Sequence, residues 1–184
     1  MNQFYLVPVL LLTLWAVGSI VTKPTLGSHS QWQSRTVVWI VALSWWLLFD
    51  RGLTGLLGWR FLPASSVAAC GGLALTTAGL ALAVWARFYT GGNWNALVEL
   101  KKDHQLIRRG PYAIVRHPIY SGFMLATLGT AVMQGELHGL SALALIVTVW
   151  GYKSRVEERF LANQFGGEYE QYRRRVKGLT PLVW

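Results

Sequence analysis

The chain has 184 residues, of which 53% are hydrophobic and only 14% are charged. Soluble domains carry about 25% charged residues, so this composition excludes an ordinary soluble domain and indicates an integral membrane protein. It also excludes a disordered segment, a coiled coil and a disulfide-stapled secreted domain, since the single cysteine, Cys70, has no partner for an internal disulfide. The net charge of +9 favours anionic lipid headgroups over nucleic acid, because the basic residues lie at the ends of apolar stretches.

Five apolar stretches follow one another in the chain, at about 4–21, 36–49, 66–86, 118–133 and 137–152. A backbone in hydrocarbon must satisfy its own hydrogen bonds, so these stretches predict an all-α membrane fold with about five transmembrane helices. The second, fourth and fifth are shorter than the ~20 residues that cross a bilayer and should continue into the interface. The first lacks the basic residues that open a signal peptide, and we interpret it as a helix. The third is rich in small residues such as Gly72 and Gly79, which permits close helix packing.

The basic residues predict an orientation for these helices. With five spans, fifteen of the 17 lysines and arginines fall on one side of the membrane, and only Arg51 and Arg60 fall on the other. The positive-inside rule then places the N-terminus outside and the C-terminus in the cytoplasm, together with the polar segments 87–117 and 153–184. We expect one membrane domain, in which three N-terminal spans (1–86) precede a catalytic half (87–184).

The start of the fourth stretch carries the first candidate site. Pro118 suits the first position of a helix, so Arg116 and His117 should stand at the positive end of the helix dipole, where free backbone donors can bind an anion. Alternatively, Arg116 extends to lipid phosphates and His117 is an ordinary interfacial histidine.

The second candidate site follows the fifth stretch, where Glu157 and Glu158 are adjacent. Neighbouring helix positions point about 100° apart, so we expect at most one of the two to face the interior. The alternative is local pairing with Lys153 and Arg155, which would contribute only ~0.2–0.5 kcal/mol per pair. A short turn joins the fourth and fifth stretches, which predicts a helical hairpin. The basic and acidic groups can therefore share one pocket, suited to a zwitterionic ligand.

The C-terminal tail predicts a helix lying in the membrane interface. Tyr169, Tyr172 and Val176 fall on one face and basic residues on the other, and lipid contact alone would explain Arg173 and Arg174. No metal site is expected, because the four histidines are scattered without ligand spacing: His29, His104, His117 and His138.

Two ordered motifs carry a resemblance to a known family. The first reads His104-x-Leu106-Ile107-x-x-Gly110-Pro111-Tyr112-x-x-x-Arg116-His117-Pro118-x-Tyr120-x-Gly122. The second reads Glu157-Glu158-x-x-Leu161-x-x-x-Phe165-Gly166-x-x-Tyr169-x-x-Tyr172-x-x-Arg175-Val176. Over about residues 85–184 the chain resembles the isoprenylcysteine carboxyl methyltransferase family, within the membrane methyltransferases that include phospholipid N-methyltransferases.

The resemblance implies S-adenosylmethionine as cofactor, bound in a cytoplasmic pocket at the ends of the last helices. The residues it implies for this pocket are His104, Gly110, Tyr112, His117, Pro118, Tyr120, Gly122, Glu157 and Glu158. Arg116 and Arg175 match arginines suited to holding an acceptor carboxylate, and Glu158 is the third catalytic candidate. The acceptor would be a lipophilic or prenylated molecule reached from the bilayer. Membrane lipids are the other expected partner, nucleic acid is not expected, and the sequence predicts no particular oligomeric state.

Several alternatives stay open at this point. A carboxylate acceptor is already ionised and needs only positioning, whereas an amine or thiol acceptor would make Glu157 or Glu158 a candidate base. A nicotinamide-dependent reductase of the sterol Δ14 type shares the C-terminal architecture, but the size of the chain argues against it. A non-catalytic lipid-binding membrane subunit would require neither Arg116 nor Glu158 individually.

Overall fold

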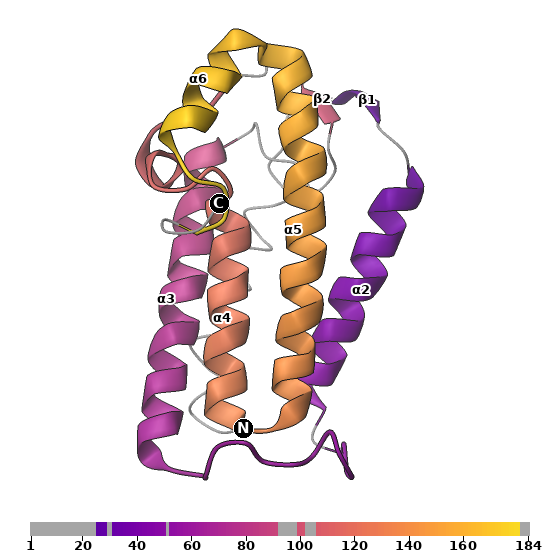
Figure 1. Cartoon of the computed structure of the whole chain (residues 1–184), viewed down its shortest axis with the longest axis vertical. Helices are drawn as coiled ribbons and strands as arrows, with labels where there is room; N and C mark the ends of the chain where they lie inside the picture. The colour runs from indigo at the N-terminus through magenta and orange to yellow at the C-terminus, as the bar shows by residue number, and fades with distance from the viewer. Residues whose placement is uncertain (1–24, 29–30, 51, 92–98, 102–105, 181–184) are drawn as a thin grey trace.

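Long helices packed lengthwise dominate the structure, a computed structural model that describes residues 25–28, 31–50, 52–91, 99–101 and 106–180. In chain order the elements are β1 (Thr25–Ser28), α2 (Gln31–Phe49), α3 (Ser66–Thr90), β2 (Glu99–Lys101), the 3-10 helix η3 (Gly110–Ala113), α4 (Pro118–Gln134), α5 (Leu137–Phe165) and α6 (Gly167–Arg175). Helices α3, α4 and α5 run side by side, α2 packs against α5, and α6 folds over one end of the bundle (Figure 1). The helical core is confirmed. The antiparallel ribbon of β1 and β2 is a feature that the sequence analysis did not predict.

The predicted apolar stretches become helices, with bounds that extend beyond the apolar residues. The stretch 36–49 lies within α2, 66–86 within α3, and 118–133 within α4. The stretch 137–152 is only the first part of α5, which continues without a break to Phe165. The predicted helix 4–21 lies outside the described residues. Among the described helices, α3 alone is long and apolar enough by itself to cross a membrane, and Trp39–Phe49 of α2 forms a shorter apolar stretch.

Helices α3 and α4 approach each other through glycines. A side chain at Gly79 would place its Cβ 2.5 Å from the Gly122 carbonyl oxygen, and a Cβ at Gly72 would lie 2.5 Å from the Gly129 carbonyl oxygen. Between these contacts, the Thr76 hydroxyl donates a hydrogen bond to the Ala126 carbonyl at 3.2 Å. The predicted close packing of the third apolar stretch is therefore realised against α4, through backbone atoms in direct contact.

A tight turn and a polar cluster hold the end of the bundle opposite α6. Gly135 adopts a left-handed conformation (φ 69°) that ends α4 and reverses the chain into α5. Glu136 accepts a hydrogen bond from Arg60 at 2.7 Å, and its other oxygen lies 3.0 Å from His138 Nε2. His138 Nδ1–H donates to the Leu47 carbonyl at 2.8 Å and so ties α5 to the last turn of α2. The predicted helical hairpin of α4 and α5 is confirmed.

Candidate functional site

The candidate site forms where the chain after α6 returns to the start of α4. The Arg116 amide donates to the Lys177 carbonyl at 2.8 Å, and the His117 amide donates to the Gly178 carbonyl at 3.1 Å. The Ser121 hydroxyl donates to the Leu179 carbonyl from the first turn of α4. Tail carbonyls thus satisfy the backbone donors that precede α4. The prediction that Arg116 and His117 stand beside free backbone donors concerns the first amides inside α4, and it stays a prediction.

Arg116 is buried, and its side chain links α5 to the chain that follows α6. Its side chain is 7% exposed, and its Nε and Nη2 donate to Glu158 Oε1 at 3.0 and 2.6 Å. Its Nη1 donates to the Arg173 carbonyl at 3.2 Å and to the Val176 carbonyl. A guanidinium has five donors, and these bonds engage four of them. Arg116 is therefore not a cation extended to lipid phosphates in this structure.

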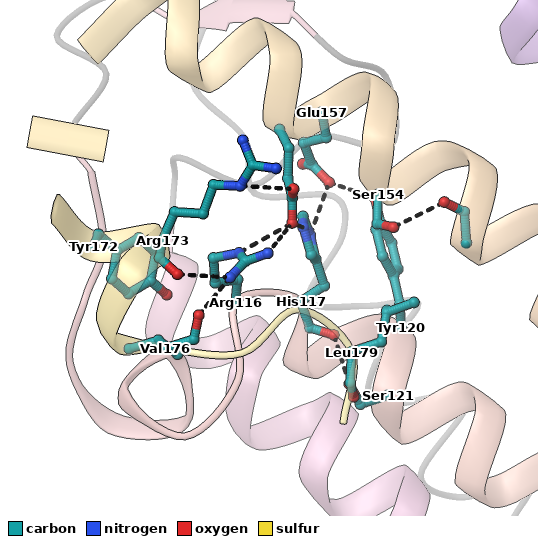
Figure 2. A network of polar contacts seen from close by, with 12 residues as sticks. Arg116, His117, Tyr120, Ser121, Ser154, Glu157, Tyr172, Arg173, Val176 and Leu179 are labelled. Atoms are coloured by element: carbon teal, nitrogen blue, oxygen red, sulfur yellow. Dashed lines mark hydrogen bonds and ion pairs between the residues drawn. The ribbon is translucent and has the colours of Figure 1, made fainter. Parts of the chain in front are cut away.

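His117 lies between the two adjacent glutamates (Figure 2). Its Nδ1 is 3.4 Å from Glu157 Oε2, and its Nε2 is 3.3 Å from Glu158 Oε1. The expectation that at most one glutamate would face the interior is wrong. The imidazole sits in the angle between the two side chains and presents one nitrogen to each.

The charges of this network stabilise one another. Burial alone would raise the pKa of Glu158, but hydrogen bonds from His117 and Arg116 lower it to about 2. Burial likewise opposes ionisation of Glu157, and the hydrogen bond from His117 outweighs it, so the pKa of Glu157 is also lowered. Burial disfavours the charged form of His117, yet its hydrogen bonds to Glu157 and Glu158 raise the pKa of the imidazole. Both glutamates are therefore carboxylates at neutral pH.

The raised pKa of His117 predicts a pH-dependent stability. A group whose folded pKa is raised contributes fully below its unfolded pKa, about 6.5 for histidine, and loses that contribution as the pH rises through the folded pKa. We expect the wild type to lose stability as the pH rises above 6.5 through the folded pKa, and His117→Gln to change little. Thermal midpoints across this pH range measure the effect. Parallel pH profiles for the two proteins would contradict the assignment of charge to His117.

A stack of aromatic rings continues from His117 into the bundle. The His117 and Tyr120 rings lie parallel with centroids 5.5 Å apart, and the Tyr120 and Trp150 rings are 4.6 Å apart. Phe123 lies 6.3 Å from Trp150 at the far end. The Lys153 ammonium stands 5.6 Å from the centre of the Tyr120 ring and 5.5 Å from that of Trp150. The ring faces already accommodate one cation.

The comparisons with known proteins agree with this arrangement. The family model of the isoprenylcysteine carboxyl methyltransferase (ICMT) family matches residues 72–163, half of the chain. The chain belongs to the ICMT family. Protein-S-isoprenylcysteine O-methyltransferase of Homo sapiens is 32% identical over 78% of this chain and 51% of its own length. The Schizosaccharomyces pombe protein of the same name is 38% identical over 53% of this chain and 43% of its own length.

A solved structure of a family member shares the fold. It is described as the eukaryotic intramembrane Ras methyltransferase ICMT, and it superposes with a TM-score of 0.59 at 26% identity, over 86% of this chain and 55% of that one. An intramembrane relative agrees with the membrane fold expected from the composition. The chain spans about half the length of the curated ICMT relatives it matches.

Several residues of the ICMT motifs lie at the network or beside it. His117, Tyr120, Glu157 and Glu158 are in direct contact, and the Tyr120 hydroxyl donates to Glu157 Oε2 at 2.9 Å. Pro118 is fully buried at the first position of α4. The role of each of these residues in cofactor binding stays a prediction.

The Gly110-Pro111-Tyr112 motif forms η3, which supports the site from the α3 side. The Tyr112 hydroxyl and the Thr90 hydroxyl share a hydrogen bond of 2.7 Å, and the Tyr112 carbonyl accepts one of 2.6 Å from the Tyr172 hydroxyl. Gly110 has a positive φ of 60°, and a Cβ there would lie 2.6 Å from the Tyr89 ring. Through these contacts η3 links the end of α3 to α6.

Two described motif residues, Gly122 and Arg175, are not part of the network. Gly122 faces Gly79 and Ala83 of α3, so the group that approaches its backbone is a neighbouring helix. Arg175 is exposed at the end of α6, and among the described residues no ion pair joins it to Glu158. His104 lies outside the described residues. The cofactor and acceptor roles that the resemblance implies for them stay predictions.

Other residues contribute to the site although they were not among the predicted site residues. The Arg173 carbonyl binds Arg116, and the Arg173 guanidinium lies 3.8 Å from Glu158 Oε2. Tyr169 and Tyr172 of α6 are buried, so the tyrosine face expected to meet lipid covers the site instead. Helical spacing could have revealed Trp150, because it lies seven residues before Glu157 on the same face of α5. In the part of the chain that the structure describes, no group of three or more His, Cys, Asp or Glu side chains could hold a metal ion.

Proposed function

We propose that this chain is an S-adenosylmethionine-dependent membrane methyltransferase that esterifies the carboxylate of a prenylated or similarly lipophilic acceptor. The observation that carries the proposal is the meeting of the two ICMT motifs, far apart in the chain, at His117, where both glutamates are held as carboxylates. Curated relatives named protein-S-isoprenylcysteine O-methyltransferase support the prenylated acceptor. The positive-inside asymmetry supports an N-terminus outside and a cytoplasmic C-terminus and active site.

The donor set fits S-adenosylmethionine, which carries a sulfonium, an ammonium and a carboxylate. The Glu157 side chain is 31% exposed, and its contacts with His117 and Tyr120 use Oε2. We propose that its Oε1 accepts a hydrogen bond from the ammonium group. The rings of Tyr120 and Trp150 suit the sulfonium at the position where they meet the Lys153 ammonium, because their other faces are covered by stacked rings. We propose that Glu157, Tyr120, Trp150 and His117 hold the cofactor. When bound, it supplies an electrophilic methyl group.

The electrostatics favour a carboxylate acceptor over an amine or thiol. A general base must take up a proton, and it works best with a pKa near the operating pH. The network lowers the pKa of both glutamates, that of Glu158 to about 2, so both are weak bases at neutral pH. A carboxylate needs no base and only has to be oriented. We propose Arg175, exposed at the end of α6, as its ligand and Arg116 as the positioning residue for Glu158.

An apolar groove supports a lipophilic acceptor that enters from the bilayer. It lies among α2, α3 and α4 and is lined mostly by apolar side chains: Trp45, Leu48, Phe49, Thr76, Leu80, Phe123, Ala126, Thr127, Thr130 and Met133. Phe123 connects it to the site, because the Phe123 ring is also the far end of the aromatic stack. An isoprenoid chain in this groove would place its polar end toward Tyr120 and Glu157.

Binding of S-adenosylhomocysteine tests the cofactor site. We expect Glu157→Gln to weaken binding about 10- to 100-fold, because the variant removes a charge-assisted hydrogen bond while keeping the shape of the side chain. Titration calorimetry on the purified full chain in detergent measures it. Glu168→Gln is the matched control, since Glu168 is exposed on α6 and pairs with Arg108. A folded wild type that binds no S-adenosylhomocysteine, or a Glu157→Gln variant that binds it equally well, would overturn the assignment.

A further inference from the structure

The part of α5 beyond its apolar stretch forms a second, basic cavity with α6. Arg155, Arg159 and Asn163 are spaced four residues apart, so they lie along one face of α5. Gly166, with a positive φ of 52°, lets the chain reverse so that α6 brings Arg173 toward this face. The cavity has a volume of about 520 Å³ and is lined by Arg155, Glu158, Arg159, Ala162, Asn163 and Arg173.

The charges around this cavity are unbalanced toward positive. Three guanidinium groups face one carboxylate, and Glu158 already accepts hydrogen bonds from Arg116 through Oε1. The Arg173 guanidinium makes two long ion pairs, 3.8 Å to Glu158 and 3.7 Å to Glu170, and its side chain is 52% exposed.

The geometry of the cavity matches a phosphate group. Arginine presents a planar fork of donors that binds phosphate with two parallel hydrogen bonds, and the Asn163 amide can add a donor. At 1.5 Å per residue, Arg155 and Arg159 lie about 5 and 10 Å beyond Tyr152, where the apolar stretch ends. A headgroup layer is about 5–8 Å thick. The cavity therefore begins at the depth of lipid phosphates and opens toward water.

The cavity is distinct from the proposed cofactor site. Arg173 and Tyr120 lie on opposite sides of the buried network of Arg116, His117 and the glutamates (Figure 2). None of the residues proposed to hold the cofactor lines this cavity: Glu157, Tyr120, Trp150 and His117. The two sites meet only at Glu158, which lines the cavity and contacts His117. We propose that the α5–α6 cavity binds a phosphate group, supplied either by an anionic phospholipid or by a soluble phosphate ester.

Thermal stabilisation by phosphate tests this site. The full chain in detergent is heated with inorganic phosphate and with chloride at equal ionic strength. At phosphate about ten times its dissociation constant, we expect the wild-type midpoint to rise by about 3 °C. Arg159→Gln should weaken phosphate binding roughly 10-fold and lose most of this shift. Arg174→Gln is the matched control, because Arg174 is exposed on α6 and does not line the cavity.

Two further measurements distinguish a lipid from a soluble phosphate ester, and the α5–α6 cavity from the cofactor site. If a lipid supplies the phosphate, nanodiscs containing phosphatidylglycerol stabilise the wild type more than phosphatidylcholine nanodiscs do, and Arg159→Gln loses the difference. If a soluble ester supplies it, only added phosphate has this effect. S-adenosylhomocysteine binding should stay unchanged in Arg159→Gln, whatever the fate of the proposed function. The proposal is overturned by a wild type without a phosphate-dependent shift, by equal shifts in Arg159→Gln and Arg174→Gln, or by a matching loss of S-adenosylhomocysteine binding.

Discussion

Arg116→Ala is expected to lower the free energy of unfolding by about 3–5 kcal/mol, the usual cost of breaking a buried ion pair from one side. The substitution leaves the buried Glu158 carboxylate without its two hydrogen bonds from Arg116. It also removes the donor to the carbonyls of Arg173 and Val176, which holds the chain after α6 against α4. Denaturant titration of the purified chain in mixed micelles measures the loss.

A double-substitution cycle separates pairing from side-chain size in this prediction. Arg116→Met removes the two guanidinium bonds to Glu158, and Glu158→Leu leaves the buried Arg116 guanidinium without its carboxylate, whereas the double variant has neither group. We therefore expect the double variant to be more stable than the sum of the single losses predicts. Arg174→Ala is the control, since it removes an exposed arginine from α6. Strictly additive losses, or equal losses for Arg116→Ala and Arg174→Ala, would show that Arg116 does not support Glu158.

Gly72→Ala is expected to destabilise the packing of α3 on α4, while the same change at the neighbouring Gly71 is tolerated. A Cβ at Gly72 would lie 2.5 Å from the Gly129 carbonyl oxygen and 2.6 Å from the Met133 amide nitrogen, so α3 and α4 would have to move apart. Such overpacking costs about 1–3 kcal/mol. A Cβ at Gly71 meets nothing within 4 Å. There alanine should gain up to about 1 kcal/mol of helix propensity.

This pair of variants has its own internal control, because both add one methyl group to adjacent positions of one helix. Thermal midpoints in detergent, together with S-adenosylhomocysteine binding, report the stability and the integrity of the site. The account requires opposite signs for the two substitutions. Equal midpoints, or a less stable Gly71→Ala, would mean that the glycine contacts do not set the distance between α3 and α4.

The helices were predictable because their signals are carried by residue types. Apolar runs predicted α2 to α5, and small residues such as Gly72 and Gly79 predicted close packing. The short turn before Leu137 predicted the α4–α5 hairpin, and the hairpin in turn predicted the meeting of His117 with Glu157. These inferences needed only local geometry.

The parts that the sequence analysis missed depend on backbone atoms and on long-range packing. The carbonyls of Lys177 and Gly178 accept hydrogen bonds from the backbone at 116–117. Every residue has a backbone carbonyl, so the residue types do not predict which carbonyls make these bonds. The continuation of α5 to Phe165 was missed because charge marked the end of the apolar stretch and not the end of the helix.

Two side chains make contacts that their residue types did not predict, and the acceptor role expected for Arg116 stays a prediction. Arg116 was expected to hold an acceptor carboxylate, and it binds Glu158 and tail carbonyls in this structure. Trp150 was assigned to an aromatic belt by its place at the end of an apolar stretch, yet it stacks on Tyr120. In both residues the type was informative and the partner was decided by the tertiary fold.

Transfer of a labelled methyl group to a farnesylated cysteine with a free carboxylate tests the central claim most directly. The full chain in nanodiscs is incubated with labelled S-adenosylmethionine and either this acceptor or the same molecule with its carboxylate blocked as an ester. The account predicts label in the free acid alone, released by mild base as expected for a methyl ester. Label that resists base, label in the blocked acceptor, or no transfer by a protein that binds S-adenosylhomocysteine would contradict it.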